Sequence, residues 1–461
     1  MTTSNRTKLI VMLVFIVMGA VTMFVGPQAR AQQRPSSFGG VVEEPFAVVL
    51  KRDKDAKARV MSEHQKMLEA RYDLSRRVDP DVKMTRGKPI PVGPTARLKG
   101  VTWEQLGKMT PEEIKDKGVF PYLPLPHIAH PVGGMVFPQV EVKALPRLER
   151  FDMDFDLPEH FLPEFPPAIF LISRPDLGDV SKGQTVTIDN FYELFNGILN
   201  PKQLDGLRLL VTQFPQQQFN ATADRKTEKA DGMRGVTCFD CHVNGHTSAA
   251  THLAGDARPQ ENRRRIDTPS LRGVNIQRLF GSQRSLKSVE DFTEFEQRAA
   301  YFDGDPVLAT KKGLSILERG SQVHNMAEFQ ELLDFPPAPK LNILGRLDRT
   351  RATQSEIRGE ELFFGKAQCA VCHTAPYYTD NLMHDLKVER FFKPRMEGGM
   401  MITAQGPIKT FPLRGIKESP PYLHDGRLLT LEDTVEFFNL ILRLDLATQE
   451  KKDLVAFMRA L

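Results

Sequence analysis

The sequence is poor in the residues that would indicate several common classes of protein. It has four cysteines and one tryptophan in 461 residues, and its 62 lysines and arginines nearly balance its 58 aspartates and glutamates, for a formal net charge of +4. A chain so close to neutrality lacks the strongly basic surface typical of nucleic-acid-binding proteins, so we expect no nucleic acid among its partners. Beyond residue 26 no apolar run is long enough to cross a membrane, so a chain cleaved near its start is expected to be soluble.

All four cysteines lie in two short motifs of the form Cys-x-x-Cys-His. The motifs are Cys238-Phe239-Asp240-Cys241-His242 and Cys369-Ala370-Val371-Cys372-His373. Cysteines three positions apart lie one turn apart on a helix, so their thiols can add to the two vinyl groups of one haem, and the adjacent histidine becomes an axial iron ligand. The sequence therefore predicts two covalently bound haem c groups, with His242 and His373 on the irons. This leaves no thiol for a disulfide, a zinc site or a cysteine nucleophile.

The first 31 residues have the pattern of an export signal. Residues 1–8 are polar and include two basic groups, residues 9–26 are almost wholly apolar, and Ala29-Arg30-Ala31 is a small-x-small cleavage pattern. Bacteria attach haem c outside the inner membrane, so we expect a periplasmic protein. The alternative is an uncleaved membrane anchor, because the apolar run is long enough to span a bilayer.

Residues 32–187 form an N-terminal extension that is proline-rich and mostly irregular. Its pattern predicts one helix at about residues 55–72, and the prolines that recur from Pro121 onward exclude long helices there. We expect extended chain that wraps a core, with Trp103 as a packing residue.

The remaining sequence is duplicated. Residues 268–274 (Thr-Pro-Ser-Leu-Arg-Gly-Val) recur as residues 410–416 (Thr-Phe-Pro-Leu-Arg-Gly-Ile), displaced by 142 positions, and Glu290-Asp291 recurs as Glu432-Asp433 at the same displacement. Apolar residues at helical spacing occur in both copies, and a capping box predicts a helix start at Thr353. We therefore expect an all-α fold of two haem modules with long loops, residues 188–339 and 340–461, joined by the proline-rich linker 335–339.

Three segments of the second module resemble a known family. Residues 358–365 (Arg-Gly-Glu-Glu-Leu-Phe-Phe-Gly), 379–386 (Thr-Asp-Asn-Leu-Met-His-Asp-Leu) and 421–427 (Pro-Tyr-Leu-His-Asp-Gly-Arg) look like the bacterial dihaem cytochrome c peroxidases and their relative MauG, a tryptophan-modifying maturation enzyme. The resemblance covers about residues 188–461 and implies two cytochrome-c-like domains, with peroxide chemistry at the first haem and electron relay through the second. It implies hydrogen peroxide as the substrate and a small redox protein, a cytochrome c or a cupredoxin, as the electron donor. It also leaves room for a calcium ion between the domains and for a homodimer.

The resemblance places the catalytic acid on the helix that follows the first Leu-Arg-Gly turn. Glu296 is the first candidate, Asp291 the second, and Glu294 lies on the same helix; the alternative for each is a solvated surface acid. We assign Arg272 and Arg414, the arginines of the two repeated turns, to cofactor binding. The basic segment 262–265 is either a clamp for haem propionates or a solvated loop.

The sequence departs from the family pattern at two places. Residues 280–284 (Phe-Gly-Ser-Gln-Arg) replace a segment in which the family carries a tryptophan between the haems, and Phe438 stands where the family supplies the sixth iron ligand of the second haem. The loop before residue 410 contains Met396, Met400 and Met401 around a Gly-Gly pair. We predict Met400 or Met401 as the replacement ligand, because a thioether raises the haem potential and glycines allow close approach of the backbone. The alternative is that these methionines only pack.

The sequence thus predicts an exported dihaem peroxidase. Reduction of peroxide to water takes two electrons, whereas small redox proteins deliver one electron at a time. A second haem that stores one oxidising equivalent lets the two haems act together. Two alternatives stay open: a MauG-like oxidase that modifies a partner protein, and a dihaem electron-transfer cytochrome with both irons six-coordinate. In the latter, His246 or His252 is a candidate sixth ligand of the first iron.

Overall fold

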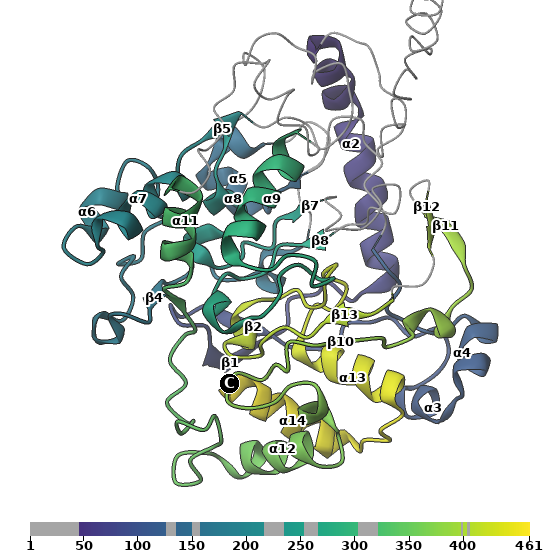
Figure 1. The fold of residues 1–461 in the computed structure, drawn as a ribbon. Helices are drawn as coiled ribbons and strands as arrows, with labels where there is room; N and C mark the ends of the chain where they lie inside the picture. Colours follow the sequence, from purple (N-terminus) through teal and green to yellow (C-terminus); the bar gives the residue numbers. More distant parts are fainter. Residues whose placement is uncertain are drawn as a thin grey trace, which may run out of the picture.

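Helices dominate the fold, and they belong to the extension and to two modules related by the sequence repeat (Figure 1). The computed structural model describes residues 46–125, 135–149, 157–215, 235–252, 266–302, 321–397, 400–402 and 406–461. The predicted export signal, the basic segment 262–265 and the Gly398-Gly399 pair lie outside these residues. In the described part of the chain, no helix is both long and apolar enough to cross a membrane.

The extension begins with the long helix α2 (Phe46–Arg71), which starts before the predicted helix. An antiparallel pair and three short helices follow: β1 (Val78–Lys83), β2 (Pro89–Pro91), α3 (Trp103–Lys108), α4 (Pro111–Lys117) and α5 (Gln139–Ala144). α3 and α4 each start at a threonine, Thr102 and Thr110, that forms a capping box. Where the structure describes the chain between these elements, it is mostly extended or irregular, because proline cannot donate to a helix or a strand ladder.

The first module packs its first long helix against its last. α7 (Pro201–Leu210) crosses α11 (Ser321–Gln330) at Gly206, where a Cβ would lie 1.9 Å from the backbone oxygen of Asn325. Only glycine allows so close a crossing. α6 (Phe191–Phe195) lies beside α7, the first Cys-x-x-Cys-His motif forms α8 (Cys238–Cys241), and α9 (Val289–Phe302) follows the Leu-Arg-Gly turn.

The second module repeats this arrangement. α12 (Gln354–Phe364) crosses α14 (Thr448–Ala460) at Gly359, where a Cβ would lie 1.9 Å from the backbone oxygen of Asp453. α13 (Leu431–Leu442) takes the place of α9. The capping box predicted at Thr353 is present, since the Glu356 carboxylate accepts a hydrogen bond from the Thr353 amide at 2.7 Å and the Thr353 side chain accepts one from the Glu356 amide.

The all-α prediction was wrong in part. The fold is helix-rich, but it also contains short antiparallel strand pairs that form small sheets. Strands of two or three residues are too short to show the alternating pattern by which strands are recognised in a sequence. The three-stranded sheet consists of β3 (Met135–Val136), β7 (Thr251–His252) and β8 (Ile266–Asp267). The pairs are β4 (Phe170–Leu171) with β9 (Leu333–Asp334), β5 (Phe214–Pro215) with β6 (Gly235–Val236), β10 (Met383–His384) with β13 (Ile408–Lys409), and β11 (Arg395–Glu397) with β12 (Met400–Ile402). The 3-10 helices are η1 (Pro146–Leu148), η2 (Glu159–Phe161), η3 (Pro175–Leu177), η5 (Val243–Gly245), η7 (Val274–Ile276), η8 (Cys369–Val371), η9 (Val388–Phe391) and η10 (Ile416–Glu418).

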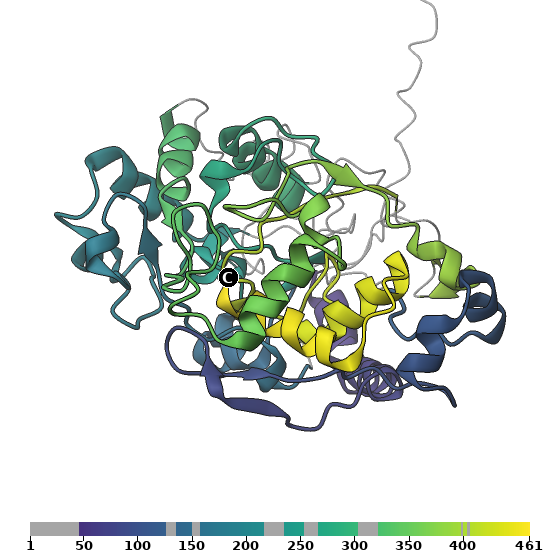
Figure 2. The ribbon, with the colours of Figure 1, turned by 90° about the horizontal axis from the view of Figure 1, so that it is seen from below.

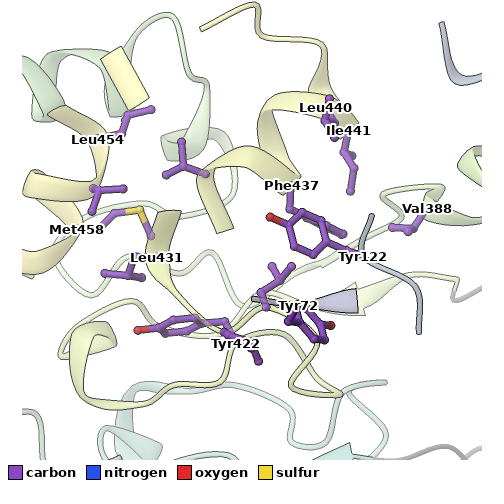
Figure 3. Close-up of a cluster of buried hydrophobic side chains, with 14 of the residues drawn as sticks. Tyr72, Tyr122, Val388, Tyr422, Leu431, Phe437, Leu440, Ile441, Leu454 and Met458 are labelled. Carbon is purple, nitrogen blue, oxygen red and sulfur yellow. The ribbon is translucent and has the colours of Figure 1, made fainter. Parts of the chain in front are cut away.

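One hydrophobic core joins much of the extension to the second module. Tyr72 and Tyr122 of the extension are fully buried in the cluster that contains Phe437 of α13 (Figure 3). Trp103 has the packing role predicted for it, because it stacks on Tyr122 with the ring centroids 6.0 Å apart. Figure 2 shows this part of the extension, in purple and blue, running past the yellow helices α13 and α14. Later residues of the extension, such as Ile169, instead enter the core of the first module.

The linker 335–339 packs against both Leu-Arg-Gly turns. Gly273 and Gly415 have φ angles of +73° and +71°, which favour glycine. A Cβ at Gly273 would lie 2.0 Å from the ring of Phe335, and a Cβ at Gly415 would lie 2.7 Å from the side chain of Pro336. The two repeated turns are therefore held against one linker, and both of their glycines are required by space as well as by conformation.

Candidate haem sites

The first Cys-x-x-Cys-His motif is held in place by a half-buried ion pair. The Asp240 carboxylate caps α8 by accepting a hydrogen bond from the Thr237 amide at 2.6 Å. The same carboxylate accepts two hydrogen bonds from Arg147 of the extension, at 2.8 and 2.6 Å. Asp240 is only 2% exposed, whereas the Arg147 side chain is 32% exposed, and their bidentate hydrogen bonds fix the helix between the two cysteines. The extension therefore contributes directly to the first site.

A second acid of the extension lies beside this pair. Glu141 on α5 is fully buried, with the hydroxyl of Ser248 near its carboxyl group. Burial, followed by the charge of Asp240, holds the pKa of Glu141 well above its ordinary value. The carboxyl group of Glu141 therefore favours its protonated form more strongly than an exposed glutamate does.

Both histidines of the two motifs are oriented in the same way. Nδ1 of His242 donates to the backbone oxygen of Pro269 at 2.9 Å, and Nδ1 of His373 donates to the backbone oxygen of Tyr378 at 2.8 Å. With the proton on Nδ1, the lone pair of each neutral imidazole is on Nε2, which is the atom that would bind iron. Burial lowers the pKa of His373, so its ring is neutral at pH 7. This repeated orientation is what a haem iron requires of its proximal ligand.

The four cysteines also suit covalent attachment of haem. All four are free thiols. The first pair lies on α8, and Cys369 lies on the 3-10 helix η8 with Cys372 at its end. In both motifs the thiols are thus one helical turn apart. The residues present therefore fit two haem c groups, held by Cys238 and Cys241 with His242, and by Cys369 and Cys372 with His373.

The structure brings one of the three predicted acids near the first motif. Glu296 on α9 is close enough for its charge to raise the pKa of Cys238, after the larger effect of burial. Asp291 instead lies in the first turn of α9, where its carboxylate accepts a hydrogen bond from the Lys287 amide at 3.0 Å. Glu294 is half-buried on the same helix. The catalytic assignment of all three acids stays a prediction.

The two repeated arginines bind groups of the protein. Arg272 is 5% exposed and donates to the Glu418 carboxylate at 2.9 Å and to the backbone oxygen of Ala168 at 2.7 Å. Arg414 donates through Nε to the backbone oxygen of Leu461 at 3.0 Å. Cofactor binding by Arg272 and Arg414 stays a prediction.

The structure does not place His246 as an iron ligand. Its Nε2 lies 3.0 Å from the backbone oxygen of Glu418 and its Nδ1 lies 2.8 Å from Oγ of Ser270, so both ring nitrogens are used within the protein. The side chain of His252 lies outside the described atoms. Phe438 lies on α13 with its ring 5.4 Å from that of Phe437, as a packing residue would.

The predicted sixth ligands of the second iron lie on a hairpin. Met400 pairs with Glu397 and Met401 with Met396 in the ladder between β11 and β12. The side chains of this hairpin are not among the described atoms, so the assignment of Met400 and Met401 stays a prediction. The calcium ion stays a prediction: among the described residues, the cluster of three candidate metal-binding side chains is Cys372, Asp380 and His384, and its thiol and imidazole do not suit calcium, which takes oxygen ligands.

Sequence reasoning missed a buried lysine at the junction of the two modules. Lys409 is 3% exposed; its Nζ donates to Oε1 of Gln277 at 2.8 Å and lies 5.4 Å from the ring centroids of both Phe280 and Phe411. Burial, followed by the charge of Arg284, lowers the pKa of Lys409 to about 7. Residues 280–284, the segment that lacks the family tryptophan, therefore contact the second module at Lys409, whose amine lies near the rings of Phe280 and Phe411. In the sequence, this site was indicated by a lysine, Lys409, directly before Thr410, the first residue of the repeated segment.

Comparison with known proteins confirms the resemblance read from the sequence. No family model matches the chain. The cytochrome-c peroxidase IdrP1 of Pseudomonas sp. (strain SCT) is 29% identical over 25% of this chain and 41% of that protein. The cytochrome c551 peroxidase of Nitrosomonas europaea is 29% identical over 30% of this chain and 42% of that protein. The methylamine utilization protein MauG of Methylorubrum extorquens is 30% identical over 23% of this chain and 33% of that protein.

The similarity is partial in each case. The chain spans less than half the length of these curated relatives. Among solved structures, a MauG-like protein associated with microbial copper homeostasis has a TM-score of 0.40 at 18% identity, covering 67% of this chain and 94% of that one. Over the matched region, the chain is similar to cytochrome-c peroxidases and to MauG.

Proposed function

We propose that the protein is an exported, periplasmic dihaem peroxidase that reduces hydrogen peroxide to water at the first haem site, with electrons received through the second. The observation that carries this proposal is the pair of Cys-x-x-Cys-His motifs, in which His242 and His373 both donate through Nδ1 to a backbone oxygen. When bound, each haem supplies a redox-active iron. A small redox protein is the proposed donor of the two electrons, which together with two protons convert one peroxide into two waters.

The residues of the chain have separate roles in this proposal. Glu296 is the group that moves a proton from one peroxide oxygen to the other, a role typically contributing about 10²- to 10⁴-fold in rate. Arg147 and Asp240 hold α8, and the fully buried Glu141 helps to exclude water from that side of the motif. The bonds from Nδ1 keep Nε2 of each proximal histidine as the ligand atom.

The first experiment counts the haems and removes the proximal ligand. Mass spectrometry of the acid-unfolded protein should show two covalently added haems. His242→Ala should keep both, because thioether bonds do not depend on the iron ligand, but should lose peroxide turnover. His324→Ala is the matched control, because His324 is exposed and pairs with Glu290 and Glu328. A single haem, or haem that acidified ketone extracts, would contradict the proposal.

The second experiment separates the acids and the alternative functions. Glu296→Gln should lower the rate about 10²- to 10⁴-fold, and Asp291→Asn and Glu294→Gln should lower it less. Wild-type rates in all three variants would show that proton transfer uses another group. A ferric spectrum without a high-spin haem would favour the electron-transfer cytochrome, and oxidation of a partner protein without consumption of a redox donor would favour MauG-like action.

A further inference from the structure

One buried glutamate joins three parts of the molecule. Glu418 lies at the end of η10, directly after the second Leu-Arg-Gly turn, and is 4% exposed. Oε1 accepts hydrogen bonds from the amide of Thr85 in the extension, at 2.9 Å, and from the hydroxyl of Thr85. Oε2 accepts a hydrogen bond from Arg272 of the first module at 2.9 Å. The backbone oxygen of Glu418 accepts a hydrogen bond from His246 of the first module at 3.0 Å.

These bonds lead to the loop that orients the first proximal histidine. Because Nε2 of His246 donates to a carbonyl, Nδ1 of this neutral ring accepts, and its partner is the hydroxyl of Ser270 at 2.8 Å. Ser270 Oγ in turn accepts a hydrogen bond from the Arg272 amide at 3.1 Å. The residue before Ser270 is Pro269, whose backbone oxygen holds Nδ1 of His242. We call residues 268–272 the proximal loop; Glu418 reaches it both through Arg272 and through His246.

The connection is specific to the first site. At the displacement of 142 positions, Glu418 corresponds to Ile276 and Arg272 to Arg414. An isoleucine cannot form these bonds, and Arg414 donates to the backbone oxygen of Leu461 instead of to the first module. The repeated module therefore does not need this glutamate for its own fold. The side chains of Arg272 and Glu418 are only 4% and 5% exposed, so the pair acts in a medium where hydrogen bonds are strong and geometry is well defined.

We propose that Glu418 is a positioning residue through which the second module fixes the proximal loop and sets the strength of the hydrogen bond from His242 to Pro269. This inference rests on the proposed function in that it takes His242 to be the ligand of the first iron. A strong bond from Nδ1 makes the imidazole a more basic ligand, which stabilises the oxidised iron. The second module then tunes the potential of the first haem without any contact between Glu418 and that haem.

The test compares three variants of the full-length protein with both haems attached. Glu418→Gln removes the charge that holds Arg272, and Ser270→Ala removes the hydroxyl between His246 and the proximal loop without leaving a buried charge unpaired. Glu436→Gln is the matched control, because Glu436 is also a buried glutamate of the second module and pairs with Lys451 at 2.8 Å. The readouts are the reduction potentials of the two haems and the Fe–His stretching frequency of the first haem in its ferrous form.

Glu418→Gln and Ser270→Ala should both raise the potential of the first haem and lower its Fe–His frequency, with the second haem unchanged. Glu436→Gln should leave the first haem as in the wild type. If Glu418→Gln does not fold, Ser270→Ala decides. Two attached haems whose potentials and Fe–His frequency stay at wild-type values in both variants would overturn the inference alone. A wild-type protein without two covalent haems would overturn the proposed function, and the inference with it.

Discussion

Replacing Lys409 by methionine should change how the stability of the protein depends on pH. The amine of Lys409 is buried between Phe280 and Phe411, and its Nζ donates to Gln277 at 2.8 Å in either protonation state. Among the described residues, no carboxylate forms an ion pair with this lysine. The neutral amine is therefore the form that the fold prefers, and methionine keeps most of its length without the titrating group.

The size and sign of the effect follow from the two pKa values. Burial lowers the pKa of Lys409 from 10.5 to about 7. A difference of about 3.5 corresponds to about 5 kcal/mol, because one pKa unit is about 1.4 kcal/mol. Between pH 7 and 10.5 the unfolded chain binds a proton that the folded chain does not, so the free energy of unfolding rises with pH in this window. Below pH 7 Lys409 is protonated in both the folded and the unfolded state, so the folded protein is destabilised by the full free energy of burying the charge.

The assay is urea unfolding of the wild type and the Lys409→Met variant across this window. Between pH 7 and pH 9 the wild type should gain about 2 kcal/mol relative to the variant, after allowance for the rounded titration near the folded pKa. Lys409→Gln is the second neutral variant, and it should lose the same pH dependence even if its packing differs. Parallel stability curves for the wild type and both variants would refute the reasoning, because they would show that Lys409 is charged in the folded protein.

Two further predictions concern a helix crossing and the second iron. Gly359→Ala should cost about 1–3 kcal/mol or more in urea unfolding, because its Cβ would lie 1.9 Å from the backbone oxygen of Asp453. Gly107→Ala, whose Cβ would lie 3.8 Å from its nearest neighbour, should instead be neutral or stabilising by up to about 1 kcal/mol, and equal effects would contradict the close crossing. For the second iron, the ferric protein should show a near-infrared methionine-to-iron band that Met400→Leu or Met401→Leu abolishes. A band that is absent from the wild type, or that survives in both variants, would show that the hairpin does not supply the ligand.

The local features of the molecule were predictable from the sequence because they depend on residues close together in the chain. The capping box at Thr353 needs only its own four residues. The Cys-x-x-Cys-His spacing predicted thiols one helical turn apart, and α8 and η8 place them so. The repeat indicated two similar modules, and the crossings at Gly206 and Gly359 show the same packing twice.

The contacts between distant segments could not be predicted in the same way. Arg272 reads in the sequence as an arginine of a repeated turn, suited to a carboxylate of any kind. The structure gives it the carboxylate of Glu418, 146 residues away. Similarly, nothing in the sequence near His246 indicates that Ser270 and a carbonyl of the other module occupy both of its nitrogens. Pairings of this kind are set by how the modules pack, which no local pattern records.

The aspartates at the start of α9 and α13 show how the extension contributes to the second module. In the second module Asp433 is fully buried, and its carboxylate accepts hydrogen bonds from the Thr95 amide at 2.6 Å, the Thr95 hydroxyl at 2.7 Å and the Tyr122 hydroxyl at 2.9 Å. A buried carboxylate is tolerated only with such donors, and here the extension supplies them in addition to the Leu429 amide, which donates at 3.2 Å. Asp291, at the same position of the repeat, is half-buried and accepts a hydrogen bond from the amide of Lys287 nearby. The two copies therefore differ at this position because Thr95 and Tyr122 of the extension reach the aspartate of the second module, whereas the described bond of Asp291 is local.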